Sequence, residues 1–197
     1  MLFRSLSSLG HEVNEVKIEA DEAYVTNFVT VWIAGTANEV ETWGRLAGRE
    51  LDIDQLEPLA RQMHDMSLQM SATDYLRALD WLHDYSRGLV RMWEGIDVLL
   101  TPTLAKPPIE IGALEPKEDE PPVQMLMNAG EWVPFTPVWN VTGQPAISLP
   151  LHQTDAGLPV GVQLVGPPAG EELLLSLAAQ IEAAEPWADR RPALAVA

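Results

Sequence analysis

TPVWNVTGQPAISLPLHQTDAGLPVGVQLVG, residues 136–166, contains the clearest secondary-structure pattern in this sequence. Residues 146–151 alternate between larger apolar side chains and smaller ones, which is the two-residue period of a strand. Residues 154–159 combine Asp, Gly and Pro, which favour a turn, and the alternation resumes in residues 160–164. Two strands joined by so short a turn pair antiparallel, so this stretch predicts a β-hairpin.

Breaker residues and glycines surround this hairpin. Pro137, Gly143 and Pro145 punctuate the segment in front of the first strand, which predicts a loop there. Gly161 and Gly166 lie in and directly after the second strand and have no side chain. We therefore expect another part of the protein to pack closely against the backbone at these two glycines.

Helical and strand patterns continue on both sides of the hairpin. Apolar residues at helical spacing predict helices that begin near residues 2, 22, 55, 71–73, 123 and 171. Asp54 and Glu57 have the spacing of a capping box at the third of these helices. Short apolar runs predict a strand in residues 13–18 and a buried strand in residues 96–101, the second following a crossover helix. Pro and charged residues fill residues 106–122, which predicts a loop.

These elements predict an α/β fold with a partial, mixed β-sheet of about four strands covered by helices. We expect the whole chain, residues 1–197, to form a single fragment without an internal domain boundary. Along the chain, the expected parts are a truncated helix and strand (1–20), a helical layer (21–95), the sheet strands with their loop and the final helix (96–187), and a tail (188–197).

The composition excludes several classes of protein. With 47% hydrophobic residues, the 197-residue chain can bury a sizeable core, which excludes wholesale disorder. Its net charge of −17 argues against partners such as nucleic acid or an anionic membrane, which are bound through Lys and Arg. The chain has no cysteine and no apolar run long enough to span a bilayer, so we expect a cytoplasmic protein.

A series of short motifs resembles the C-terminal part of the amidase signature family. The motifs occur in the family's order and spacing over nearly the whole chain, from residue 2 to about residue 192. They are DVLLTPT at 97–103, FTP at 135–137, NVTGQPAISLP at 140–150, GLPVGVQ at 157–163 and PW at 186–187. The series is most similar to general amidases, including members that act on linear or cyclic aminohexanoate oligomers.

This resemblance implies hydrolysis of a carboxamide by a Ser-Ser-Lys triad, whose nucleophilic Ser lies in a segment of the GGSSGGS type. The chain has no such segment, and its only adjacent serines, Ser7 and Ser8, lie in the first predicted helix without a Gly cluster. We therefore expect no catalytic residue in this chain, and we expect its partner to be the missing N-terminal half of an amidase. The resemblance implies neither a cofactor nor a metal.

The predicted loop in front of the hairpin is the best candidate for a functional site. The resemblance implies that this loop lies behind, or forms a wall of, the amide substrate pocket of the complete fold. A second interpretation is structural, because Asn and Thr side chains often bond the backbone in turns. The candidate substrate-pocket residues are Trp139, Asn140, Thr142, Gly143 and Gln144.

The sequence gives less support to a serine nucleophile, a zinc site or a calcium-binding loop. Ser148 lies in a predicted strand without the Gly-x-Ser-x-Gly elbow that exposes a nucleophile. The histidines show no i, i+4 pair of the kind that binds zinc on a helix. Asp52 and Asp54 lack the Gly and the distal Glu of a calcium loop. The four histidines are His11, His64, His83 and His152.

Two alternatives to an amidase portion stay open at this point. The chain could be a stand-alone structural or protein-interaction module derived from an amidase. It could also belong to a glutamyl-tRNA amidotransferase A-like subunit, although residues 140–145 read NVTGQP where that subunit has N-L-A-G-L-P. A sheet that is cut off from the strands that would continue it leaves unpaired backbone groups at its edge. We therefore also expect a homodimer formed through that edge.

Overall fold

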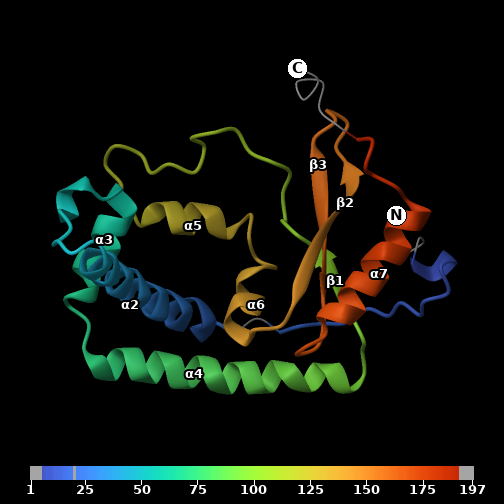
Figure 1. Ribbon diagram of the computed structural model, residues 1–197, viewed down its shortest axis with the longest axis horizontal. Helices are drawn as coiled ribbons and strands as arrows, with labels where there is room; N and C mark the ends of the chain where they lie inside the picture. The colour runs from blue at the N-terminus through green and yellow to red at the C-terminus, as the bar shows by residue number, and fades with distance from the viewer. Residues whose placement is uncertain (1–5, 20, 191–197) are drawn as a thin grey trace. The chain divides into compact units, whose positions relative to one another are not determined.

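A computed structural model describes residues 6–19 and 21–190 of the chain (Figure 1). The helix predicted from residue 2 therefore lies partly, and the predicted tail mostly, outside the described residues. The described residues form two compact units. The sheet unit consists of residues 6–19, 92–108 and 133–190, and the helical unit consists of residues 21–91 and 109–132.

The α/β class is confirmed, and the sheet differs from the prediction in detail. Its strands are β1 (Leu99–Pro102), β2 (Ala146–Gln153) and β3 (Pro159–Val165). They lie in the order β1-β3-β2, and both strand pairs are antiparallel. The described part of the chain thus holds three antiparallel strands, where the sequence predicted about four strands in a mixed sheet. The short run at residues 96–101 gives the edge strand β1, which begins at Leu99.

The strand predicted in residues 13–18 does not form. Val16 and Ile18 are 40% and 38% exposed, and residues 11–19 have no regular secondary structure. A strand exists only where its backbone pairs with a neighbouring strand, and none of the three described strands pairs with this segment. The spacing of apolar residues along the sequence cannot show whether a neighbouring strand is present. Val13 nevertheless packs against the core of the sheet unit.

The predicted hairpin of β2 and β3 is confirmed. Ile147 pairs with Leu164, and Leu149 pairs with Val162, before the register shifts between Leu149 and His152. Pro150 lies at this irregularity, because proline has no N–H to give to a sheet ladder.

The two faces of the sheet carry separate apolar clusters. One face packs against the helix α7 (Glu171–Ala184), which contributes Leu174, Ala178 and Ile181. The other face carries a smaller cluster centred on Leu99, Val165 and a tryptophan of the helix α6 (Pro137–Thr142). Leu164 and Val165 are both fully buried, one in each cluster, since neighbouring residues of a strand face opposite sides.

The helical unit contains four α-helices and a short 3-10 helix. They are α2 (Ala23–Leu46), η1 (Ile53–Gln55), α3 (Pro58–Ser67), α4 (Ala72–Val90) and α5 (Gln124–Gly130). A second 3-10 helix, η2 (Arg91–Glu94), leads from α4 into the sheet unit. Tyr24 on α2 lies 5.2 Å from Tyr85 on α4, between ring centroids, and 5.7 Å from Phe28. Burial raises the pKa of both tyrosines above the usual range.

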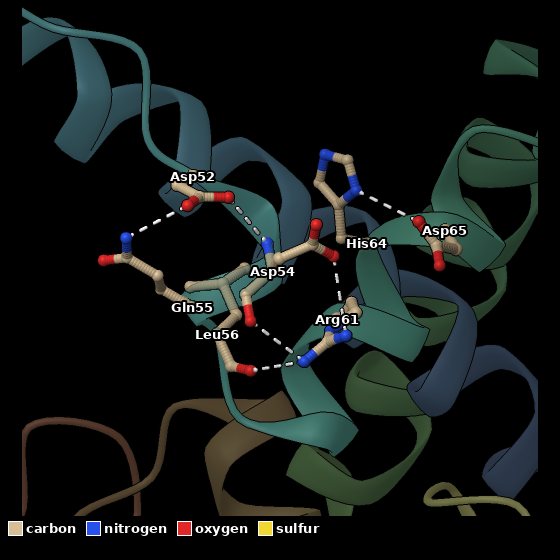
Figure 2. A network of polar contacts seen from close by, with 7 residues as sticks. All are labelled: Asp52, Asp54, Gln55, Leu56, Arg61, His64 and Asp65. Carbon is tan, nitrogen blue, oxygen red and sulfur yellow. Dashed lines mark hydrogen bonds and ion pairs between the residues drawn. The ribbon is translucent and has the colours of Figure 1, made fainter.

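The capping box predicted at Asp54 is wrong, and a different one is present. Helix α3 begins only at Pro58, while Asp54 lies in η1 and its carboxylate is 3.5 Å from Arg61 (Figure 2). Arg61 also donates hydrogen bonds to the carbonyl oxygens of Asp54 and Leu56, which fastens η1 to α3. At α4, Ser71 and Asp74 form the true capping box, and the hydrogen bonds from Ser71 lower the pKa of Asp74.

The close packing expected at the two glycines is confirmed. A Cβ atom on Gly161 would lie 2.7 Å from both Ser148 Oγ and Thr103 Oγ1, and one on Gly166 would lie 3.2 Å from Leu174 Cγ. Gly161 is therefore the position where β3 lets two neighbouring hydroxyl groups meet, 2.6 Å apart, above its backbone.

We expect Gly161→Ala to lower the free energy of unfolding by about 1–2 kcal/mol, because the new methyl group forces the Ser148–Thr103 hydrogen bond apart. The matched control is Gly88→Ala in α4, where a Cβ meets nothing within 4 Å. This control should stabilise the protein by up to about 1 kcal/mol, since Ala is a better helix former. Urea unfolding followed by circular dichroism measures both, and equal effects would contradict the packing described at Gly161.

Candidate functional site

The segment predicted as a loop in front of the hairpin is a short helix. Helix α6 spans Pro137–Thr142 and ends at Gly143, whose φ of 74° is left-handed. The loop prediction was wrong because the same two residues can mark the two ends of a helix. Proline is tolerated in the first helical turn, and glycine accepts the left-handed conformation after the last.

The structure divides the five predicted site residues into an outer and an inner group. Asn140 and Gly143 are exposed, and Thr142 is half-buried. Trp139 and Gln144 are 5% and 6% exposed, so they belong to the interior. Trp139 and Thr142 are three positions apart and therefore lie on the same face of α6.

Trp139, Gln144 and the half-buried Thr142 have several buried polar atoms without a hydrogen-bond partner among the described residues. They are Trp139 Nε1, Thr142 Oγ1, and both Nε2 and Oε1 of Gln144. The turn interpretation of the sequence is thus wrong for Thr142, whose hydroxyl bonds no backbone group in the part of the chain that the structure describes. A buried polar group left unpaired costs about 1–3 kcal/mol, so each of these atoms makes the fold less stable than a paired or apolar group would.

Two further residues belong to this region, and the sequence analysis did not single them out. Trp93 packs against the same cluster as Trp139, and its Nε1 also has no partner among the described residues. Gln163 is 5% exposed, and its Nε2 donates to Thr101 Oγ1 at 3.1 Å and to the carbonyl oxygen of Phe135 at 2.9 Å. A glutamine inside the apolar strand pattern VGVQLVG was the signal that could have revealed Gln163.

A second polar region lies beside the hairpin. A hollow of about 280 Å³ is lined by Ser148, Thr103 and Lys106 together with a set of mainly apolar residues. The hydroxyl of Ser148 lies 2.6 Å from that of Thr103. A neutral hydroxyl is no general base, so this pair does not activate Ser148 as a nucleophile. The remaining lining residues are Leu104, Pro107, Pro108, Pro150, Pro159, Val160 and Gly161.

Two of the four histidines lie close to a polar side chain. His11 Nε2 lies 2.8 Å from Gln180 Oε1, and His64 Nδ1 lies 3.6 Å from the carboxylate of Asp65 (Figure 2). Within residues 6–19 and 21–190, no three His, Cys, Asp or Glu side chains gather in a way that could hold a metal ion. Over the same part of the chain, no helix combines the length and the apolar character needed to cross a membrane.

Comparison with a family model and with curated proteins matches this chain to amide hydrolases. The family model for Amidase matches residues 1–175. The chain is 36% identical, over 197 residues, to the 6-aminohexanoate-cyclic-dimer hydrolase of Pseudomonas sp. (strain NK87), covering 96% of this chain and 40% of that protein. It is 37% identical to the hydrolase of the same name from Paenarthrobacter ureafaciens, with the same coverage.

A solved structure described as a 6-aminohexanoate cyclic dimer hydrolase superposes with a TM-score of 0.88 at 36% identity. The superposition covers 98% of this chain and 41% of that chain. The chain thus spans about 40% of the length of the curated relatives that it matches.

The unpaired hydroxyl of Thr142 gives a direct test of the site geometry. We expect Thr142→Val to raise the free energy of unfolding by about 1 kcal/mol, because it removes a buried hydroxyl that has no partner and keeps the shape of the side chain. The matched control is Thr101→Val, which takes an acceptor from Gln163 and should lower the free energy by about 1 kcal/mol. Thermal and urea unfolding measure both, and a loss of stability in Thr142→Val would show that its hydroxyl is paired.

Proposed function

Because this chain belongs to the amidase signature family and corresponds to a C-terminal portion of its members, we propose that it is part of a hydrolase that cleaves carboxamide C–N bonds. The observation that carries this proposal is the match of 96% of the chain to 40% of a named amide hydrolase. The activity of the complete enzyme then depends on groups outside these 197 residues.

The proposed reaction divides the work between the two portions. A serine hydroxyl attacks the amide carbonyl carbon and gives its proton to a relay of a second serine and a lysine. The tetrahedral intermediate expels the amine, which takes up a proton, and water then hydrolyses the acyl-enzyme. The family resemblance assigns the nucleophilic serine to a Gly- and Ser-rich segment, with the lysine and the second serine upstream of it, and these 197 residues contain no such segment. We therefore expect the chain to be inactive alone.

The region around α6 is the proposed contribution of this chain to the substrate pocket. Asn140 and Gly143 are exposed, and they stand next to the buried Trp139 and Gln144. In this proposal the exposed residues face the substrate, while Trp139 holds α6 against the sheet. The candidate pocket residues stay Trp139, Asn140, Thr142, Gly143 and Gln144, with the direct role assigned to the first exposed position, Asn140.

The names of the relatives suggest the first substrate to assay. The Pseudomonas and Paenarthrobacter proteins are called 6-aminohexanoate-cyclic-dimer hydrolases, so this cyclic diamide is the first choice and a simple aryl amide is the second. No cofactor is part of the proposal, because a Ser-Ser-Lys relay needs none. A cytoplasmic location stays a prediction from the lack of cysteine.

Complementation tests this proposal. We expect the chain to show no amide hydrolysis by itself, and to support it when co-expressed with the portion of the Paenarthrobacter relative that has no counterpart in this chain. Product is measured as released amine. In the active pair, Asn140→Ala should lower kcat/KM by about 10-fold, a loss typical of one removed substrate contact. The exposed Asn38→Ala on α2 is the matched control and should leave kcat/KM unchanged.

Two outcomes would contradict the proposal. Hydrolysis by the rigorously purified chain alone would show that its catalytic groups lie within it. Absence of hydrolysis by a pair that folds and associates would favour the alternative of a stand-alone interaction module.

The edges of the sheet give a further prediction about the isolated chain. In the described part, β1 and β2 each pair on one side only, with β3. We propose that β2 edges of two copies pair, and we expect a dimer of the 21.7 kDa chain in light scattering. The dimer fraction should rise with salt, because each copy carries a net charge of −17 and salt screens the repulsion. Ala146→Lys should weaken the dimer, and a monomer at every salt concentration would contradict it.

A further inference from the structure

The short helix α6 is tied to the central strand β3 at both of its ends. In front of the helix, Nε2 of Gln163 on β3 donates a hydrogen bond to the carbonyl oxygen of Phe135 at 2.9 Å. Behind the helix, the backbone N–H of Gly166, directly after β3, donates to the carbonyl oxygen of Pro145 at 2.9 Å. Residues 163–166 therefore hold the two flanks of α6 in place.

The tie in front of α6 fastens the end of the helix that has no cap of its own. A helix of six residues is too short to be stable by itself. Thr136, at the N-cap, makes no side-chain capping hydrogen bond within the part of the chain that the structure describes. The carboxamide of Gln163 reaches the residue directly before this N-cap. The place of the first turn of α6 thus depends on a side chain that lies far along the sequence.

Gln163 is itself held on a fixed base. It lies in the register of the sheet between Thr101 on β1 and Ser148 on β2. Its Nε2 also donates to Thr101 Oγ1 at 3.1 Å, which orients the carboxamide. Gln163 is only 5% exposed, so bulk water competes little for this donor. Because a hydrogen bond is directional, a donor fixed in this way limits where its acceptor can lie.

We propose that Gln163 is a positioning residue of the amidase and that it acts through α6. By holding the carbonyl oxygen of Phe135, it fixes the beginning of the helix and with it the place of the exposed Asn140. The inference rests on the proposed function, which assigns the direct substrate contact to Asn140. Gln163 makes no substrate contact in this proposal.

The surroundings of Gln163 favour positioning over stabilisation alone. Its neighbours on β3, Val162 and Leu164, are apolar and are 7% or less exposed. A buried hydrogen bond adds only modestly to the free energy of unfolding, whereas its direction restricts the geometry of the groups that it joins. A glutamine within this apolar strand therefore contributes chiefly to where the segment in front of α6 lies.

Hydrogen exchange of the isolated chain gives the first arm of the test. Gln163→Met keeps the length of the side chain and removes both donor hydrogens. We expect residues 137–143 to exchange at least about 5-fold faster in this variant, because the lost bond frees the beginning of α6. The matched control is Ile181→Val on α7, which loosens the core on the opposite face of the sheet.

The control separates positioning from a general loss of stability. Ile181→Val should leave the exchange of residues 137–143 as it is in the parent chain. Parent-like exchange of these residues in Gln163→Met would overturn the proposal. Equal acceleration in both variants would overturn it too, because α6 would then respond to any weakening of the sheet unit.

Kinetics of the complemented pair give the second arm. Each variant is co-expressed with the portion of the Paenarthrobacter relative that has no counterpart in this chain, and released amine is measured. We expect Gln163→Met to lower kcat/KM by about 10-fold, and the double variant with Asn140→Ala to lose about the same 10-fold. Residues that act through one contact are not additive, whereas independent effects multiply to about 100-fold.

The outcomes of this arm distinguish the inference from the proposed function. Parent-like kcat/KM in Gln163→Met, or multiplied losses in the double variant, would overturn the inference alone. A parent pair that folds and associates without hydrolysing amides would contradict the proposed function and, with it, the inference. Ile181→Val should keep the kcat/KM of the parent pair.

Thr101→Val covers the case in which Gln163→Met does not fold. It keeps Gln163 and removes the acceptor that orients the carboxamide. We expect faster exchange in residues 137–143, by about 2-fold or more, and again no addition to the loss caused by Asn140→Ala. Parent-like exchange and kcat/KM in Thr101→Val would then overturn the proposal.

Discussion

The pairing of β3 on both of its sides is the constraint on which the sheet unit depends. Gln163 stands in a row between Thr101 on β1 and Ser148 on β2, and Leu164 stands between Leu100 and Ile147. Each row places chemically similar residues on one face, so the register of a single strand fixes which side chains meet. A shift by one residue would move the apolar row to the polar side of the sheet.

Helix α6 depends on this register as well. The backbone N–H of Gly166, directly after β3, donates to the carbonyl oxygen of Pro145 at 2.9 Å. This bond holds the segment between α6 and β2 against the end of β3, while Trp139 packs on Val165 and Leu99. The short helix is too small to be stable alone, so its position is imposed by the sheet beneath it.

The two faces of the sheet differ in the groups that they bury. The face under α7 is a finished core, with Leu174, Ala178 and Ile181 buried on it. The face under α6 is buried too, but the Nε1 atoms of Trp93 and Trp139 have no hydrogen-bond partner within residues 6–19 and 21–190. Such groups make the fold less stable than it would be with these atoms paired.

The sequence by itself determined those elements that depend on residues only a few positions apart. The β2–β3 hairpin, the close approach at Gly161 and the final helix follow from strand alternation, turn residues, glycines and the helical spacing of apolar residues, which act within a few positions, and the structure contains all three. The motif series also determined the family, since it depends on residue order alone.

Tertiary structure decided what depends on distant neighbours. Residues 13–18 have strand periodicity but no strand beside them, so they stay irregular. The segment before Gly143 became a helix because the sheet offered Trp139 an apolar surface, which no local pattern encodes. The two glutamines differ for the same reason: only the fold brings Thr101 and Phe135 to Gln163 and leaves Gln144 buried without a partner among the described residues.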